Sequence, residues 1–268
     1  MLQRLRDFFK PSPPPKLPAV PPGTRYYAIG DIHGRLDLYE ALIGAIETEI
    51  AQAPEYDHHV IVLGDLVDRG PDSAGVVERT RIWQQTGNVQ VLAGNHEEMF
   101  LTAFTKPEAL RHFLKHGGTE TVLSYGLSRK QLATMDLDEI FARLPEIVPQ
   151  SVRDYIAGFE TMVRTGDYVF VHAGVDPART LADQQRSDLL WIRERFLNHV
   201  GPLEKVVVHG HTIFETVMDC GNRIGIDTGA FRSGVLTALV LEGDRRRVLQ
   251  ARAAQGESPA VFHGDRPH

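Results

Sequence analysis

The sequence has almost no cysteine and no long run of apolar residues. Its one cysteine, Cys220, cannot form a disulfide within the chain, so a disulfide-based scaffold is excluded. No stretch reaches the roughly 18 apolar residues that a membrane-spanning helix needs. The first residues also lack the apolar core of a signal peptide. We therefore expect a cytoplasmic protein without a transmembrane segment.

The chain also lacks an excess of positive charge. It has 29 Lys and Arg residues against 35 Asp and Glu residues, which gives a formal net charge of −6 at pH 7. This balance provides no general attraction to nucleic acid or to anionic lipid, so neither is an expected partner. The 268 residues, 42% of them hydrophobic, suit one globular domain with an insertion.

The first 24 residues differ in composition from the rest. Residues 1–10 could form a short amphipathic helix, and the proline-rich run at residues 11–22 should be stiff and extended. We interpret residues 1–24 as a flexible leader, with membrane-surface contact or a docking tail as open alternatives. The catalytic domain is expected over residues 25–252, and residues 253–268 are expected to form a C-terminal tail.

Several short apolar runs in the middle of the chain end abruptly in a polar residue. Each run has the length of a buried strand. Each places its polar residue at the carboxyl end of the strand, where open α/β sheets bind ligands. The runs are Tyr26–Ile29, Val60–Leu63, Val89–Ala93, Tyr168–Val171, Val206–Val208 and Arg223–Ile226. A last strand, Val235–Glu242, should form a hairpin with Arg247–Ala251.

Helical patterns fill the gaps between these strands. Leu36–Ala51 and Ser73–Gln85 are predicted helices, and the stretch from Glu97 to Phe159 is mostly helical. We interpret this stretch as a helical lobe, at about residues 98–160, inserted between the third and fourth strands. The alternation of strands and helices indicates an α/β fold.

The polar residues at the strand ends are of the kinds that bind metal ions. Asp31 and His33 are two apart, so in an extended strand end they face the same side. Asp65 has two carboxylate oxygens and can bridge two metals. The six candidate ligands, at the ends of five successive strands, are Asp31, His33, Asp65, Asn95, His172 and His211.

This ligand set favours particular metals and a particular reaction. Asp, Asn and His side chains without thiolates suit Mn²⁺, Fe or Zn²⁺. Two such ions roughly 3.5–4 Å apart can activate water and neutralise charge on a phosphoryl group. Phosphate monoesters are among the slowest bonds to hydrolyse without a catalyst. The sequence therefore predicts a phosphoester hydrolase with a dinuclear metal centre.

Five motifs, in order, resemble the metal-dependent phosphoprotein phosphatase family. The resemblance is closest to its bacterial and lambda-phage-type branch, within the calcineurin-like metallophosphoesterases, and covers about residues 25–245. It implies a four-layer β-sandwich of two mixed sheets flanked by helices. The motifs are Gly-Asp-Ile-His-Gly, Gly-Asp-Leu-Val-Asp-Arg-Gly, Gly-Asn-His-Glu, His-Ala-Gly and Gly-His-Thr.

The resemblance also implies a role for each site residue. Asp31, His33 and Asp65 would hold the first of two divalent ions, with Mn²⁺ favoured over Fe or Zn²⁺. The second ion would be held by Asp65, Asn95, His172 and His211. Attack by metal-bound hydroxide on phosphorus would follow, without a phosphoenzyme.

Four further side chains would complete the reaction by this resemblance. His96 would protonate the leaving oxygen, and Asp68 would orient His96 and raise its pKa. Arg69 and Arg193 would hold the phosphate oxygens, together with Asn95. A different reading of Arg193 is a solvated, ion-paired helix segment.

Four functions remain open, and one of them is a broad phosphomonoesterase or a cyclic-nucleotide phosphodiesterase. The leading one is hydrolysis of phosphoserine and phosphothreonine, with phosphotyrosine as a further substrate, in phosphorylated proteins or peptides. The alternative is hydrolysis of dinucleoside polyphosphates such as diadenosine tetraphosphate; Asp68 and Glu97 favour the protein phosphatase. The alternative from a different class is a catalytically silent phosphopeptide-binding module. The short motif His116-Gly117-Gly118 resembles the phage-type branch, but we assign it no chemistry.

Overall fold

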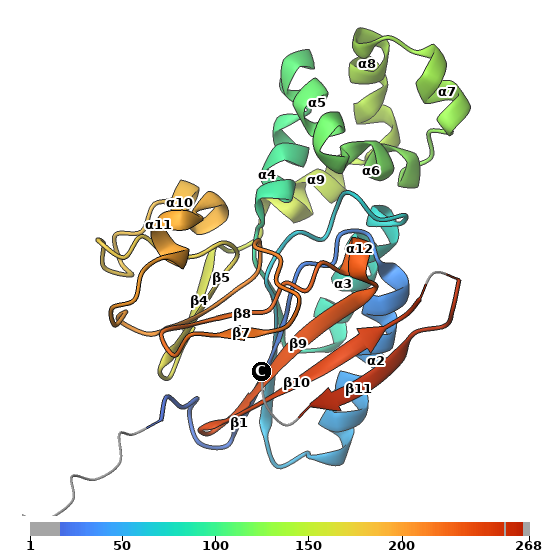
Figure 1. Ribbon diagram of the computed structural model, residues 1–268. Helices are drawn as coiled ribbons and strands as arrows, with labels where there is room; N and C mark the ends of the chain where they lie inside the picture. The colour runs from blue at the N-terminus through green and yellow to red at the C-terminus, as the bar shows by residue number, and fades with distance from the viewer. Residues whose placement is uncertain (1–16, 255, 265–268) are drawn as a thin grey trace, which may run out of the picture.

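The computed structural model describes residues 17–254 and 256–264 (Figure 1). The helix expected at residues 1–10 and the first half of the proline-rich run, residues 11–16, lie outside the described residues. Within these two ranges, no helix is both long enough and apolar enough to cross a bilayer.

The first of two sheets has six strands in the order β11-β10-β9-β1-β2-β3. β1, β2 and β3 are parallel, and the other three strands are antiparallel to their neighbours. The strands are β1 (Thr24–Ile29), β2 (Asp57–Val62), β3 (Val89–Val91), β9 (Val235–Glu242), β10 (Arg245–Arg252) and β11 (Ala260–Gly264).

The second sheet has five strands in the order β4-β5-β6-β8-β7. β5, β6 and β8 are parallel, and β4 and β7 run antiparallel at the two edges. The strands are β4 (Met162–Thr165), β5 (Tyr168–Val171), β6 (Val206–His209), β7 (Met218–Asp219) and β8 (Arg223–Gly225).

Alternating side chains place the two sheets face to face. In β1, Ala28 packs in the core between the sheets, whereas Tyr27 and Ile29 point to the opposite core. In β5, Phe170 likewise faces the first sheet and Val171 faces away. Two helices cover the outer face of the six-stranded sheet, and two shorter ones cover the five-stranded sheet. They are α2 (Leu36–Gln52), α3 (Ser73–Thr86), α10 (Arg186–Trp191) and α11 (Glu194–Leu197). The predicted four-layer sandwich is therefore confirmed.

A lobe of helices is inserted between β3 and β4 and stands at the top of Figure 1. Its aromatic core includes Phe100 and Phe113, whose ring centroids lie 5.8 Å apart, and both side chains are fully buried. The lobe consists of α4 (Asn95–Thr102), α5 (Pro107–Phe113), the π-helical turn η2 (Leu114–Gly118), α6 (Thr119–Ser124), α7 (Arg129–Thr134), α8 (Leu137–Ile147) and α9 (Gln150–Ala157).

Both ends of the described chain add to the sandwich. Val20 is buried, and its N–H donates to the carbonyl of Gly243, so the last part of the expected leader packs on the first sheet. β11 lies within the segment expected as a tail and pairs with β10. Its side chains are mostly exposed, so this edge strand carries no hydrophobic pattern that the sequence could reveal.

Candidate metal centre

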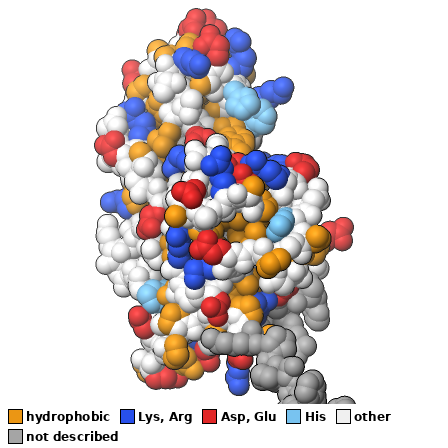
Figure 2. Space-filling model, turned by 90° about the vertical axis from the view of Figure 1, so that its left-hand side faces the viewer, with side chains coloured by type: hydrophobic (Ala, Val, Ile, Leu, Met, Phe, Trp, Pro, Cys, Tyr) orange, Lys and Arg blue, Asp and Glu red, His pale blue; other side chains and the backbone are white. Residues whose placement is uncertain are grey.

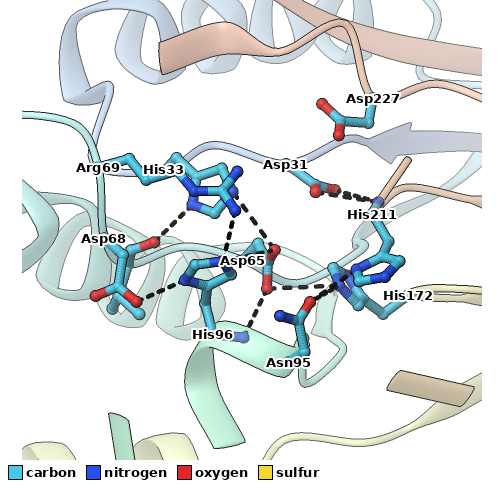
Figure 3. Close-up of polar contacts among 12 residues, drawn as sticks. Asp31, His33, Asp65, Asp68, Arg69, Asn95, His96, His172, His211 and Asp227 are labelled. Atoms are coloured by element: carbon cyan, nitrogen blue, oxygen red, sulfur yellow. Dashed lines mark hydrogen bonds and ion pairs between the residues drawn. The ribbon is translucent and has the colours of Figure 1, made fainter. Parts of the chain in front are cut away.

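The six predicted ligands lie together at one edge of the sandwich (Figure 3). The carboxyl ends of the parallel strands meet at this edge. All six side chains are buried, and the most exposed, His211, has an exposed fraction of 7%. Asp31 and His33 follow β1, Asp65 follows β2, Asn95 follows β3, His172 follows β5 and His211 follows β6.

Asp65 lies at the centre of the site. It belongs to two groups of side chains whose ligand atoms all lie within 4.8 Å of one another: one with His33 and His96, the other with His172 and His211. Its Oδ2 lies 3.5 Å from His33 Nε2, and its Oδ1 lies 3.5 Å from His172 Nε2. The two carboxylate oxygens therefore face different histidines, so this one side chain could serve both groups.

The hydrogen bonds of two histidines leave ring nitrogens free to bind metal. His33 Nδ1 lies 2.8 Å from the Val67 carbonyl, and His172 Nδ1 lies 2.8 Å from the Leu63 carbonyl. A carbonyl only accepts, so Nδ1 carries the proton in each ring and Nε2 carries a lone pair. His33 Nε2 is buried and has no hydrogen-bond partner among the described residues.

Asn95 completes the second group in a similar way. As its amide is placed, Oδ1 lies 2.9 Å from His172 Nε2 and 2.8 Å from His211 Nδ1. His172 Nε2 has no proton to donate, so two lone pairs face each other there, which is unfavourable unless a cation lies between them. His211 Nε2 is also without a partner within the described part of the chain. The residues present therefore fit divalent metal ions.

Backbone strain is concentrated at this centre. Among the described residues, the non-glycine residues with positive φ are His33, Asp65, Asp68, Arg69 and His211. Such conformations are uncommon outside glycine and are retained where the surrounding structure enforces them. Neighbouring backbone also approaches closely: a Cβ on Gly94 would lie 2.1 Å from Asp65 Oδ1. Only glycine therefore fits at position 94.

Burial and charge set the protonation of the ligands. Burial lowers the pKa of His33 to about 3 and also lowers the pKa values of His172 and His211. Burial opposes the Asp65 carboxylate, but the nearby histidines outweigh it and hold its pKa below the ordinary range. Neutral imidazoles around an ionised carboxylate are the protonation state that a metal ion needs.

Asp31 has a different neighbourhood from the other five. Its Oδ2 accepts the His211 N–H at 3.0 Å, and it is not part of either group around Asp65. Burial, Asp227 and Asp65 raise its pKa well above the ordinary value. Asp227 is buried beside it (Figure 3), and burial raises the pKa of Asp227 to about 6. Asp227 is not among the predicted site residues, although its position directly after the apolar run Arg223–Ile226 is a sequence signal for it.

His96 is held by two side chains of the loop after β2. Its Nδ1 lies 2.6 Å from Asp68 Oδ2, and its Nε2 lies 2.9 Å from Arg69 Nη2. Both ring nitrogens thus have partners, which distinguishes His96 from the histidines with free nitrogens. Burial opposes its charged form, but Asp65 and Asp68 outweigh burial and raise the pKa of His96.

Arg193 directly precedes α11, and this helix lies on the side of the molecule that Figure 2 shows. Basic side chains gather there, and Arg179, Arg186 and Arg195 are paired with acidic groups. Arg193 is exposed, and its side chain has no hydrogen bond or ion pair with any described residue. Its charge contributes to the lowered pKa values of His172 and His211. It is therefore near the centre and free to bind an anion.

Glu97 holds the backbone of the loop after β2, which carries Asp65. Its carboxylate accepts the N–H groups of Asp65, Leu66, Val67 and Gly94 at 2.8–3.3 Å. Burial and Asp65 raise its pKa to about 7. The sequence showed Glu97 only as a mark of one family branch, and its grip on the backbone of Asp65 was not expected.

His209 lies two residues before the predicted ligand His211 but does not belong to the metal site. Its ring packs edge-on against Phe196 at 5.0 Å, and it is not in either candidate metal group. Burial lowers its pKa to about 4. His116 is exposed in η2 and donates from Nδ1 to the His112 carbonyl at 2.8 Å.

Several known proteins are similar to this chain over most of its length. Serine/threonine-protein phosphatase 1 of Salmonella typhimurium is 33% identical over 216 residues, which cover 79% of this chain and 89% of that protein. Serine/threonine-protein phosphatase 2 of Escherichia coli is 29% identical, over 81% of this chain and 97% of that protein. The symmetrical bis(5'-nucleosyl)-tetraphosphatase of an Acidovorax species is 30% identical, over 68% of this chain and 50% of that protein.

A family match covers the same region. Residues 24–230 match the calcineurin-like phosphoesterases, and this range includes every predicted site residue. The match covers strands β1 to β8 and the helical lobe, and the resemblance drawn from the motifs is confirmed. The chain belongs to the calcineurin-like phosphoesterase family and is a phosphatase.

Proposed function

We propose that this phosphatase hydrolyses phosphoserine and phosphothreonine in proteins or peptides, with phosphotyrosine as a further substrate. The observation that carries the proposal is the buried pair of Asp68 and His96, whose Oδ2 and Nδ1 lie 2.6 Å apart. The serine or threonine oxygen leaves as a poor alkoxide unless it receives a proton. A buried, oriented imidazole with a raised pKa is suited to supply that proton.

The metal ligands are proposed as the sequence predicted them. Asp31, His33 and Asp65 would hold one divalent ion. A second ion would be held by Asp65 with Asn95, His172 and His211. We favour Mn²⁺, since carboxylate, amide and imidazole ligands suit it, with Fe or Zn²⁺ as alternatives. When bound, the two ions supply an activated water and neutralise charge on the phosphoryl group.

The protein's own groups would bind and orient the substrate. Arg69 and Arg193 would hold the phosphate oxygens, where a planar guanidinium makes two parallel bonds, and Asn95 would assist them. Arg69 is preoriented by the Phe231 ring, 4.8 Å from its guanidinium carbon. In the structure Arg69 Nη2 donates to His96 Nε2, so Arg69 would first leave Nε2 for the phosphate oxygens. His96, then able to carry a proton on Nε2, would transfer it to the leaving oxygen, while Asp68 stabilises the imidazolium.

Hydrolysis of dinucleoside polyphosphates is the second candidate, because several relatives are named bis(5'-nucleosyl)-tetraphosphatases. Its leaving group is a nucleotide, which departs as a stable phosphate anion and needs a proton much less. The Asp68–His96 pair therefore favours the phosphoprotein substrate. We place the protein in the cytoplasm, in keeping with its single cysteine.

Relative rates on defined substrates test the proposal. With Mn²⁺ present, kcat/KM should be higher for a phosphoserine peptide than for diadenosine tetraphosphate, with p-nitrophenyl phosphate as a reference for intact metal chemistry. The Asp68→Asn variant should lose rate on the phosphopeptide more than on p-nitrophenyl phosphate. A preference for the dinucleotide by orders of magnitude would overturn the assignment.

A further inference from the structure

Buried hydroxyl groups join the helical lobe to the loop that carries Asp68. Thr121, in α6, and Ser73, at the start of α3, have no solvent-exposed surface. Their side-chain oxygens lie 2.9 Å apart, and each lies 2.9 Å from the backbone nitrogen of Asp68. Thr121 Oγ1 also lies 2.6 Å from Asp68 Oδ1. The proposed reaction assigns no role to either hydroxyl.

The supply of protons decides the direction of these hydrogen bonds. An ionised carboxylate only accepts, so Thr121 donates its single hydroxyl proton to Asp68 Oδ1. Ser73 must then donate to Thr121, because the Thr121 proton is already used. The Asp68 N–H donates to both hydroxyl oxygens. Every polar atom of this buried cluster is thereby satisfied.

The Asp68 carboxylate is consequently held at both of its oxygens. Oδ2 receives the proton of His96 Nδ1 at 2.6 Å, and Oδ1 receives the proton of Thr121. Within the described residues, Thr121 is the only side chain that bonds to Oδ1. Without it, one oxygen would be buried and unpaired, and rotation of the carboxylate would weaken its bond to His96.

We propose that Thr121 is a positioning residue, which fixes the Asp68 carboxylate so that His96 can protonate the leaving oxygen. The inference rests on the proposed role of His96 as general acid. Thr121 lies 53 residues beyond Asp68 in the chain, and it belongs to the lobe rather than to the sandwich. The lobe thus contributes to catalysis through a buried hydroxyl group that does not itself contact the substrate.

The adjacent turn holds the neighbouring residue by a separate contact. The Arg69 N–H donates to the Gly117 carbonyl at 3.0 Å. Gly117 has a φ of +112°, and a Cβ there would lie 2.7 Å from Arg69 Cγ. A Gly117→Ala substitution should therefore displace Arg69, and the loss of phosphate binding should be similar for all phosphoesters.

The test compares leaving groups in the Thr121→Val variant, which keeps the shape and removes the hydroxyl. kcat/KM on a phosphoserine peptide should fall about 10- to 100-fold, as expected for a lost hydrogen bond to a charged group. The rate on 2,4-dinitrophenyl phosphate, whose leaving group needs no proton, should change less than about 3-fold. Thr121→Ser should restore the phosphopeptide rate.

Matched variants separate this role from a structural one. Thr134→Val, in α7 of the same lobe, removes a hydroxyl that bonds only to carbonyls of its own helix and should leave both rates unchanged. Ser73→Ala should also slow the phosphoserine peptide more than 2,4-dinitrophenyl phosphate, with a smaller loss of kcat/KM than Thr121→Val. It replaces Thr121→Val in the test if that variant does not fold. Metal content and Tm should stay near those of the wild type.

The outcomes distinguish this inference from the proposed function. Equal losses on both substrates in Thr121→Val, or no loss on the phosphopeptide, would overturn the positioning role. His96→Asn is the reference: if it also loses both substrates equally, the general-acid role itself is wrong. If His96→Asn is selective and neither Thr121→Val nor Ser73→Ala is, only the positioning role is wrong.

Discussion

The sandwich and the helical lobe contribute to the site in different ways. The loops at the ends of the sandwich strands carry His33, Asp65, His172 and His211, whose unpartnered or closely grouped ligand atoms fit metal ions. Of the predicted ligands, only Asn95 lies in a helix of the lobe, at the first residue of α4. The lobe instead holds the loop of Asp68 and Arg69, through Thr121 and Gly117.

The comparison shows that metal binding and proton transfer depend on different parts of the molecule. Changes at the strand ends should release metal and abolish every reaction. Changes at the contact between the lobe and the loop should leave the metal bound and affect only steps that need an oriented acid. The first two predictions below test this division, and the third concerns a buried histidine of the five-stranded sheet. They follow in decreasing order of the expected free-energy change.

The largest effect is expected for Asp65→Asn. The amide removes the charge between the two groups of ligands, so metal binding and turnover should both be lost, the latter by more than about 10⁴-fold. Elemental analysis and kcat measure the two losses. Asp219→Asn, which breaks an ion pair with Arg246 at the far edge of the second sheet, is the control. Retention of both ions in Asp65→Asn would contradict a shared ligand.

A smaller loss is expected for His96→Asn. Removal of the general acid should reduce kcat on a phosphoserine peptide about 10²- to 10⁴-fold, while metal content stays near normal. The same elemental analysis checks this. His96 is grouped with His33 and Asp65, so loss of one ion in this variant would show that it is a ligand and would break the division between the two regions.

The smallest effect concerns His209 and pH. Its pKa is about 4 in the folded protein and ordinarily 6.5, so the unfolded chain binds more protons between these values. Its contribution to stability is therefore complete above pH 6.5 and is lost as the pH falls to about 4, a change of about 3 kcal/mol. Urea unfolding with chelator present, for wild type and His209→Phe, measures it. If the free energy of unfolding depended on pH in the same way in both proteins, the lowered pKa of His209 would be refuted.

The strands and most of the metal ligands are predictable from the sequence, because each ligand lies close to its strand along the chain. Asp65 directly follows an apolar run and a glycine, and the same holds for Asp31 and Asn95. An apolar run predicts the strand, and the strand places its polar neighbour at the sheet edge. For this reason β5 and β9 were predicted to the residue.

Other features depend on contacts that no local pattern shows. Thr121 meets Asp68 across 53 residues, and Glu97 reaches the backbone of Asp65 across 32. No local sequence pattern around Thr121 or Glu97 indicates which residue it contacts. The positive φ of His33 and Asp65 is likewise imposed by surrounding structure, since neither residue type requires it.

The position of Asp65 has a mechanical consequence. It follows a strand of the six-stranded sheet, yet it faces His172 and His211, which follow strands of the five-stranded sheet. Ions bound to both groups would tie the two sheets to each other at one end, much as a covalent staple does. A chain with a single cysteine would thereby gain a cross-link between its layers that no thiol reductant can cut, but that a chelator can remove.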